Sequence, residues 1–241
     1  MNNRQIWDQV EKTNPAGTKQ AKVNGQSITS INAHYLIERA TEIFGPAGIG
    51  WGWNVVEERF DNGGEIRNDK GEVIGNEIGH TVRISFWFYL NGKRGEIEQY
   101  GCTPFAYKSK WGVTTDTEAP KKSLTDAIKK ALSMLGFSAD IFKGQFDDVD
   151  YVLERQEEAA IAEAEDKEAE IARQKEERLT WLKNAIETME SAVTVHELTK
   201  LHATYVRNAT RRKEDAYVTR LARTFEEKKA KLEEMKNEQA V

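Results

Sequence analysis

The residues that could do covalent chemistry are few, and the usual catalytic patterns do not occur. No G-x-x-x-x-G-K-[S/T] phosphate loop is present, and Gly48, Gly50 and Gly52 precede an expected strand rather than a helix. The four histidines are scattered and Cys102 is the one cysteine, so no spacing matches a zinc site. We therefore expect no catalytic residue, no metal and no cofactor.

Acidic residues offer one rival to this interpretation. Asp147, Asp148 and Asp150 are close together in the sequence, but the other ligands of a calcium loop are missing. A solvated acidic turn is the favoured interpretation. A metal-dependent nuclease that uses Asp116 or Asp147 stays as a hypothesis, which magnesium-dependent cleavage would support, although no pair of carboxylates is spaced for it.

Basic residues next to aromatic ones indicate a different chemistry, the non-covalent binding of nucleic acid. Lysines neutralise phosphates without reading sequence, and aromatic rings stack on unpaired bases. The candidates are Lys108, Lys110 and Trp111 in one expected loop, and Lys121, Lys122, Lys129 and Lys130 on one expected helix. Lys122 and Lys129 fall two helical turns apart on nearly the same face. An ordinary solvated face is the alternative interpretation.

The elements that would position these residues follow from the hydrophobic pattern. A helix is expected from Ser30 to Phe44, and a second from Pro120. Between them, strands are expected at 48–60, 81–90 and 96–106, with Asn91–Gly92 as a hairpin turn. Three further segments have the composition of loops: 14–26, 61–75 and 107–120. The expected class is α+β, a three-stranded antiparallel β-meander flanked by helices (a β-β-β-α core), followed by an α-helical C-terminal extension.

Composition divides the chain into three parts. Aromatic residues and glycines crowd residues 1–150, which predicts a globular domain. Residues 151–178 are nearly all strong helix formers with little to bury, which predicts a charged helical linker. Residues 179–241 contain amphipathic segments and are expected to form a helical module that binds a partner or stabilises an oligomer.

Charge and targeting signals limit where the protein acts. The net charge of −5 argues against a general nucleic-acid binder, but a groove can be basic while the rest of the surface is acidic. One cysteine excludes a disulfide within the chain, and the first residues resemble no signal peptide. No apolar run is long enough for a membrane span. We expect a cytoplasmic protein without a membrane partner, in the host cell cytoplasm if a phage encodes it.

Two segments resemble the Rad fifty-two superfamily of single-strand annealing proteins, including its phage recombinases of the Sak and Erf type. The first has the pattern His34, Ile37, Ala40, Glu42, Phe44 and Gly45. The second has Thr125, Asp126, Ile128, Lys129, Lys130, Ala131, Leu132, Leu135 and Gly136. Their order, their separation and the intervening strands all agree, and the resemblance covers residues 20–145.

The resemblance implies ATP-independent binding and annealing of single-stranded DNA in recombination or repair, by a homo-oligomeric ring or helical filament. It makes residues 1–150 the expected DNA-binding and oligomerisation core for annealing. Lys129 and Lys130 match the basic pair of the family's groove. Tyr35 stands where the family often has arginine, so Tyr35 is expected to stack on a base or Arg39 to compensate, and Ser133 replaces a third basic residue.

Two questions remain open from the sequence. The C-terminal helices are expected to recruit a single-strand binding protein or an exonuclease, or to stabilise the oligomer. The alternative function is an oligomeric helical scaffold without annealing activity, which would form stable oligomers that do not bind DNA.

Overall fold

The computed structural model describes residues 3–23 and 25–238. The chain divides into two compact units, Met1–Asp147 and Asp148–Val241, each with its own hydrophobic core. Acidic and basic residues are equal in number in the first unit, so the net charge of −5 falls entirely in the second. The acidic balance of the whole chain is therefore not a property of the sheet-containing unit. No helix among the described residues is both long and apolar enough to cross a bilayer.

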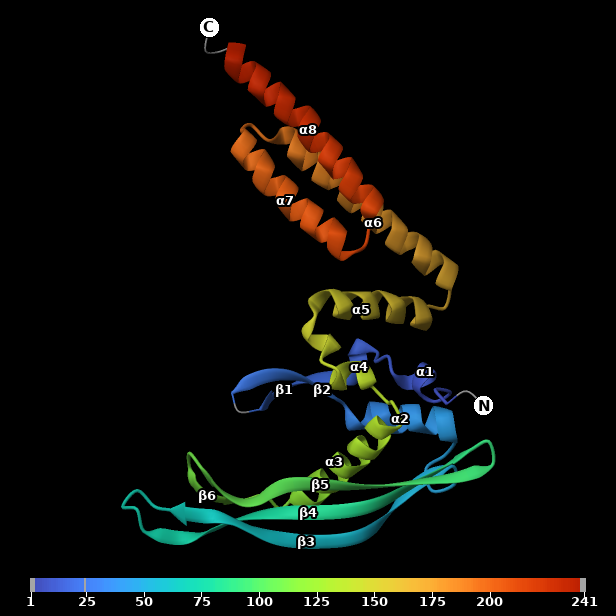
Figure 1. Ribbon diagram of the computed structural model, residues 1–241, viewed down its shortest axis with the longest axis vertical. Helices are drawn as coiled ribbons and strands as arrows, with labels where there is room; N and C mark the ends of the chain where they lie inside the picture. The colour runs from blue at the N-terminus through green and yellow to red at the C-terminus, as the bar shows by residue number, and fades with distance from the viewer. Residues whose placement is uncertain (1–2, 24, 239–241) are drawn as a thin grey trace. The chain divides into compact units, whose positions relative to one another are not determined.

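The first unit is built on a four-stranded antiparallel sheet in the order β3-β4-β5-β6 (Figure 1). The strands are β3 (Trp51–Arg67), β4 (Val73–Leu90), β5 (Lys93–Ser109) and β6 (Gly112–Thr115). The predicted α+β class and antiparallel meander are confirmed, but the prediction of three strands is wrong. Asn91 and Gly92 form the expected turn between β4 and β5, with φ values of 51° and 74°.

The strands are also longer than predicted. Most of the expected loop 61–75 continues β3 and β4, and the turn is limited to Asn68–Glu72, where the Asn68 N–H donates to the Glu72 carbonyl at 3.0 Å. The register shifts between Asn62 and Glu65, so Gly63 and Gly64 lie in an irregularity of β3. Glycine and charged residues gave this segment the composition of a loop, but pairing with the opposite strand decides its structure.

β6 is the strand that the sequence did not predict. It pairs with Ala106–Ser109 of β5, and Gly112 takes a φ of 111° at the turn. The four residues of β6 include one valine, which is too little hydrophobic alternation to predict a strand. Their structure depends instead on pairing with the open edge of β5.

A separate hairpin, β1 (Thr18–Val23) and β2 (Gln26–Ile31), replaces the predicted loop at 14–26. In β2 only Ile31 is buried. The strand therefore needs no alternation of apolar and polar residues, which is the pattern that would predict it from the sequence. This hairpin carries Lys19, which becomes important for the candidate site.

Helices cover one face of the four-stranded sheet (Figure 1). They are α1 (Trp7–Val10), α2 (Ala33–Phe44), α3 (Ala119–Met134) and α4 (Ala139–Phe142), with short 3-10 turns at Pro15–Gly17 and Gln145–Asp147. Asn32 caps α2 by accepting the His34 N–H at 3.0 Å, and Gly45 ends it with a φ of 91°. Leu36 of α2 and Leu132 of α3 pack with Phe86 in the core, which fixes both helices on the sheet.

The second unit is entirely helical, with α5 (Val149–Glu163), α6 (Lys167–Ser191), α7 (Val195–Arg211) and α8 (Asp215–Glu238). Leu182, Met189, Leu198 and Leu221 are among its buried residues. The predicted boundary at residue 178 falls inside α6, and residues 151–178 span most of α5 and the first half of α6. Near residue 179 the apolar residues of the sequence change from mostly alanine to leucine. This change marks the part of α6 that packs in the core, and α6 itself begins earlier, at Lys167.

Candidate nucleic-acid interface

Helix α3 is held tightly on the sheet, which fixes the position of its lysines. A Cβ atom on Gly101 of β5 would lie 1.9 Å from the carbonyl oxygen of Ser123, so only glycine allows this close approach. The Ser123 hydroxyl donates to the carbonyl of His80 on β4 at 3.1 Å. Ala127 and Ala131 are fully buried on the same side of the helix. The lysines of α3 are therefore carried by a helix whose position on the sheet is fixed.

The structure brings three of the predicted lysines together in one surface hollow of about 240 Å³. Its lining residues are Lys121, Lys122, Thr125, Asp126 and Lys129. Lys121 and Lys122 have side chains 78% and 57% exposed, whereas Lys129 is half-buried. Lys130 lies one residue further, 54% exposed, and pairs with Asp126 at 3.3 Å. A hollow with this lining can accept a phosphate group.

Lys129 differs from its neighbours because it is half-buried and forms no ion pair with any described residue. Burial lowers its pKa, and the positive charge of Lys19 on β1 lowers it further, while Asp126 raises it. Among the described residues no carboxylate lies within ion-pair distance of Lys129 or Lys19. Asp126 thus offsets only part of the burial and repulsion that Lys129 experiences, and a phosphate in the hollow would offset more. The sequence placed Lys19 in a loop, and only the β1–β2 hairpin brings it near α3.

The partly buried charge of Lys129 is expected to lower the stability of the folded protein. Replacing Lys129 with methionine keeps the apolar stem and removes a charge that folding partly desolvates, so the midpoint of thermal unfolding at neutral pH is expected to equal or exceed that of the wild type. The folded-state pKa lies below the ordinary value near 10.4, so the unfolded chain binds more protons and wild-type stability rises with pH. The difference in unfolding midpoint between Lys129→Met and the wild type should therefore become smaller as the pH rises through the folded-state pKa of Lys129.

Lys130→Met is the matched control, because Lys130 is exposed and already paired with Asp126. It is expected to give no gain in stability. Thermal unfolding of both variants between neutral and alkaline pH checks the prediction, and a Lys129→Met protein that melts well below the wild type would contradict it.

The turn between β5 and β6 presents the second part of the candidate site. Trp111 is 86% exposed, and the Lys110 ammonium group lies 4.9 Å from the centre of its ring. The Ser109 hydroxyl accepts the Trp111 N–H at 3.2 Å and stabilises the turn. Lys108 is less available, since it donates to the carbonyl of Arg67 at 2.7 Å. Lys110 and Trp111 are therefore placed to contact a strand, by charge and by stacking.

β6 connects this turn directly to α3. Asp116 follows β6, and its N–H donates to the carbonyl of Phe105 on β5 at 2.7 Å. Its carboxylate accepts from Lys122 at 2.5 Å. The turn that carries Trp111 and the hollow on α3 thus belong to one continuous stretch of chain.

Tyr35 and Arg39 have structural contacts in this protein. The Tyr35 hydroxyl accepts the Asn14 N–H at 3.1 Å, and a Cβ on Gly17 would lie 2.5 Å from the tyrosine ring, which is therefore covered. Burial raises the pKa of Tyr35. Arg39 pairs with Glu42 and donates to the carbonyl of Gln9 at 2.8 Å. Both side chains anchor the N-terminal segment, so the structure gives no support to base stacking by Tyr35 or to compensation by Arg39.

The face of the sheet opposite the helices is charged but self-neutralised. Arg59 pairs with Glu57 and Asp61, and Arg94 pairs with Glu96 at 2.8 Å. Arg83 lies 3.4 Å from Glu57 and 3.1 Å from Glu98. This face offers a phosphate backbone no excess of positive charge, in contrast to the region around Lys129 and Lys19.

The carboxylates suggested for a nuclease are not arranged for metal binding. Asp116 pairs with Lys122, and Asp147 is an exposed residue at the end of a 3-10 turn. In the part of the chain that the structure describes, no three histidine, cysteine or carboxylate side chains gather where they could share a metal ion.

An α+β unit with a lysine-lined hollow and an exposed Lys110–Trp111 turn has the features of a nucleic-acid-binding protein. A comparison with protein families identifies the family: the Rad52/22 family of double-strand break repair proteins matches residues 4–143, more than half of the chain. The chain belongs to this family, as its two sequence motifs predicted, and its role lies in DNA repair and recombination. No curated protein and no solved structure matches it. Helices α5 to α8 lie outside the matched residues.

Proposed function

We propose that this protein binds single-stranded DNA and anneals complementary strands without ATP and without covalent chemistry. The observation that carries the proposal is the hollow on α3, which Lys121, Lys122 and Lys129 line together. Lys129 has no ion-pair partner among the described residues, and the positive charge of Lys19 adds to that of the hollow. Family membership adds the biological setting of strand-break repair. In this proposal the lysines hold phosphates, Trp111 stacks on an unpaired base, and base pairing itself supplies the free energy of annealing.

The test is the annealing of two complementary fluorescent oligonucleotides by the full chain, without nucleotide, at low and moderate salt. We expect the protein to accelerate annealing, and the acceleration to fall as salt rises because phosphate contacts are electrostatic. A folded, oligomeric protein that leaves the rate unchanged would favour the alternative, a helical scaffold. Magnesium-dependent cleavage of the oligonucleotides would favour the nuclease hypothesis.

We further propose that the protein works as a homo-oligomer, in a ring or a helical filament. The open edge of β3 supports this proposal. Among the described strands β3 pairs with β4 alone, and Trp51 at its start bridges Ala47, so the other edge is open to a partner strand beyond Trp51. Val55, Val56 and Phe60 on this strand are 53%, 45% and 53% exposed. An apolar open edge of this length is suited to pairing with another copy of the chain.

Val56→Lys is expected to reduce oligomer size, because a charge on an edge strand opposes pairing with another strand. Val56 falls in the register shift between Val55 and Glu57, so it opposes no residue of β4 and the fold should tolerate the change. Mass photometry against Val193→Lys, an exposed control in the helical unit, checks the prediction. Unchanged oligomers of both variants would remove β3 from the interface.

The helical unit supports a recruiting role in this proposal. We propose that α6 to α8 bind a single-strand binding protein or an exonuclease, or else stabilise the oligomer. Deleting residues 151–241 separates these roles: smaller oligomers indicate assembly, and the loss of partner binding alone indicates recruitment. We place this activity in the cytoplasm, of the host cell if a phage encodes the protein.

A further inference from the structure

Most of the candidate DNA-binding lysines already have an anionic partner within the protein. Lys122 donates to Asp116 at 2.5 Å, and Lys121 donates to Glu118 at 2.9 Å. Lys130 lies 3.3 Å from Asp126. A strand that enters the hollow must therefore displace carboxylates before its phosphates can take these lysines.

Asp116 is the most firmly held of these carboxylates. Its side chain is only 17% exposed, and besides Lys122 it accepts the Glu118 N–H at 3.0 Å. The hydrogen bond from Lys122 lowers the pKa of Asp116, so the carboxylate stays ionised. Asp116 is thus held ionised beside Lys122, where it competes with a phosphate for the same ammonium group.

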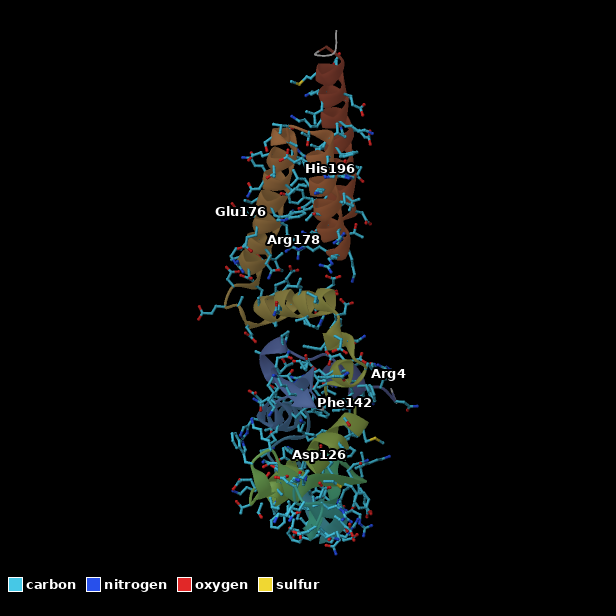
Figure 2. The ribbon with its side chains drawn as sticks, turned by 90° about the vertical axis from the view of Figure 1, so that its left-hand side faces the viewer. Arg4, Asp126, Phe142, Glu176, Arg178 and His196 are labelled. Atoms are coloured by element: carbon cyan, nitrogen blue, oxygen red, sulfur yellow. The ribbon has the colours of Figure 1, made fainter. Side chains whose placement is uncertain are left out.

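Asp126 lies within the hollow itself, on α3 (Figure 2). It pairs with Lys130 and favours the charged form of Lys129, against burial and the charge of Lys19. A DNA phosphate in the same hollow would favour that charged form equally. Asp126 therefore occupies the electrostatic role that a phosphate would take.

We propose that Asp116 and Asp126 are internal competitors of DNA phosphate, which lower the affinity of the lysine hollow and keep strand binding reversible. The inference rests on the proposed function. Ion pairs as exposed as those of Lys121, Lys122 and Lys130 break readily, so a phosphate can replace the carboxylate. Each displaced carboxylate repels the strand or takes up a cation, and this offsets part of the gain from counter-ion release. An annealing protein benefits, because it must release the duplex that it forms.

The test uses the full chain with Asp116→Asn or Asp126→Asn and a fluorescein-labelled oligothymidylate of about 30 nucleotides, long enough for several contacts. Asparagine at 116 keeps an oxygen that accepts the Glu118 N–H, and it removes the charge. Glu98→Gln is the matched control, because it removes one negative charge from the opposite face of the same sheet. We expect each asparagine variant to bind about threefold more tightly at low salt, to lose affinity more steeply as salt rises, and to release the strand more slowly. Glu98→Gln should bind like the wild type.

Three outcomes are informative. If the wild type binds and both asparagine variants match Glu98→Gln, the inference is overturned and the proposed function stands. Weaker binding by folded asparagine variants would overturn it also, since it would mean that the carboxylates orient the lysines for DNA. If the wild type binds no oligonucleotide at low salt, the proposed function fails and the inference with it. Thermal unfolding of each variant shows whether a loss of binding reflects a loss of fold.

Discussion

Lys129→Ala combined with Lys130→Ala is expected to weaken binding of single-stranded DNA by about tenfold or more at low salt and to abolish most annealing. The two residues contribute differently. Lys129 lines the hollow and forms no ion pair with a described residue, while Lys130 first exchanges Asp126 for a phosphate. The slope of affinity against salt should also fall, by about 0.7 for each phosphate contact that is lost. Fluorescence anisotropy at several salt concentrations measures both quantities.

The fold should survive this double change. Ala131 and Leu132, rather than the two lysines, face the core, and alanine is a strong helix former. The matched control is Arg223→Ala with Lys231→Ala, which removes the same charge from exposed positions on α8. Folded protein that still anneals after loss of both lysines would remove them from the site. An equal loss in the control would indicate a general effect of net charge.

Trp111→Ala is expected to have the second large effect, a loss of about tenfold in affinity for single-stranded DNA. Stacking of a base on an aromatic ring is worth about 1–3 kcal/mol, and about 1.4 kcal/mol corresponds to a factor of ten. Trp111 is 86% exposed, so its removal should leave the thermal unfolding midpoint nearly unchanged. The salt slope should also stay close to that of the wild type, because stacking neutralises no phosphate.

Two further variants make this prediction specific. Trp111→Phe keeps a ring for stacking and should recover much of the affinity. Phe142→Ala removes another exposed aromatic residue of the same unit, on α4 (Figure 2), and should bind like the wild type. Wild-type affinity in Trp111→Ala would show that the ring contacts no base. Failure of Trp111→Phe to recover binding would indicate that the indole has another role.

The sequence determined those features that depend on local patterns. The helix around Leu36, the hairpin turn at Asn91–Gly92 and the lysine-bearing helix from Pro120 were all predicted, because capping residues, turn residues and hydrophobic spacing act over a few positions. The two motifs predicted the family for the same reason. The α+β class followed from these elements, but β6 and the β1–β2 hairpin did not, since short polar strands depend on partners elsewhere in the chain.

The candidate site was predictable only as a list of basic and aromatic residues. Nothing in the sequence connects Lys19 with Lys129, because residues 110 positions apart act on each other only when the hairpin and α3 are in place. It also offered Tyr35 for stacking or Arg39 for compensation, and the contacts of half-buried Tyr35 with Asn14 and Gly17 could not be seen from the sequence.

What the sequence by itself determined is thus the family, the class of fold and the kinds of side chain available, all of which follow from local order. What only the tertiary structure decided is which charges remain uncompensated. Lys122 and Lys130 acquire carboxylate neighbours while Lys129 acquires Lys19, and the overall charge of −5 separates into a neutral sheet unit and an acidic helical one. The physical reason is that electrostatic interactions depend on distance and burial in space, which composition and sequence spacing do not specify.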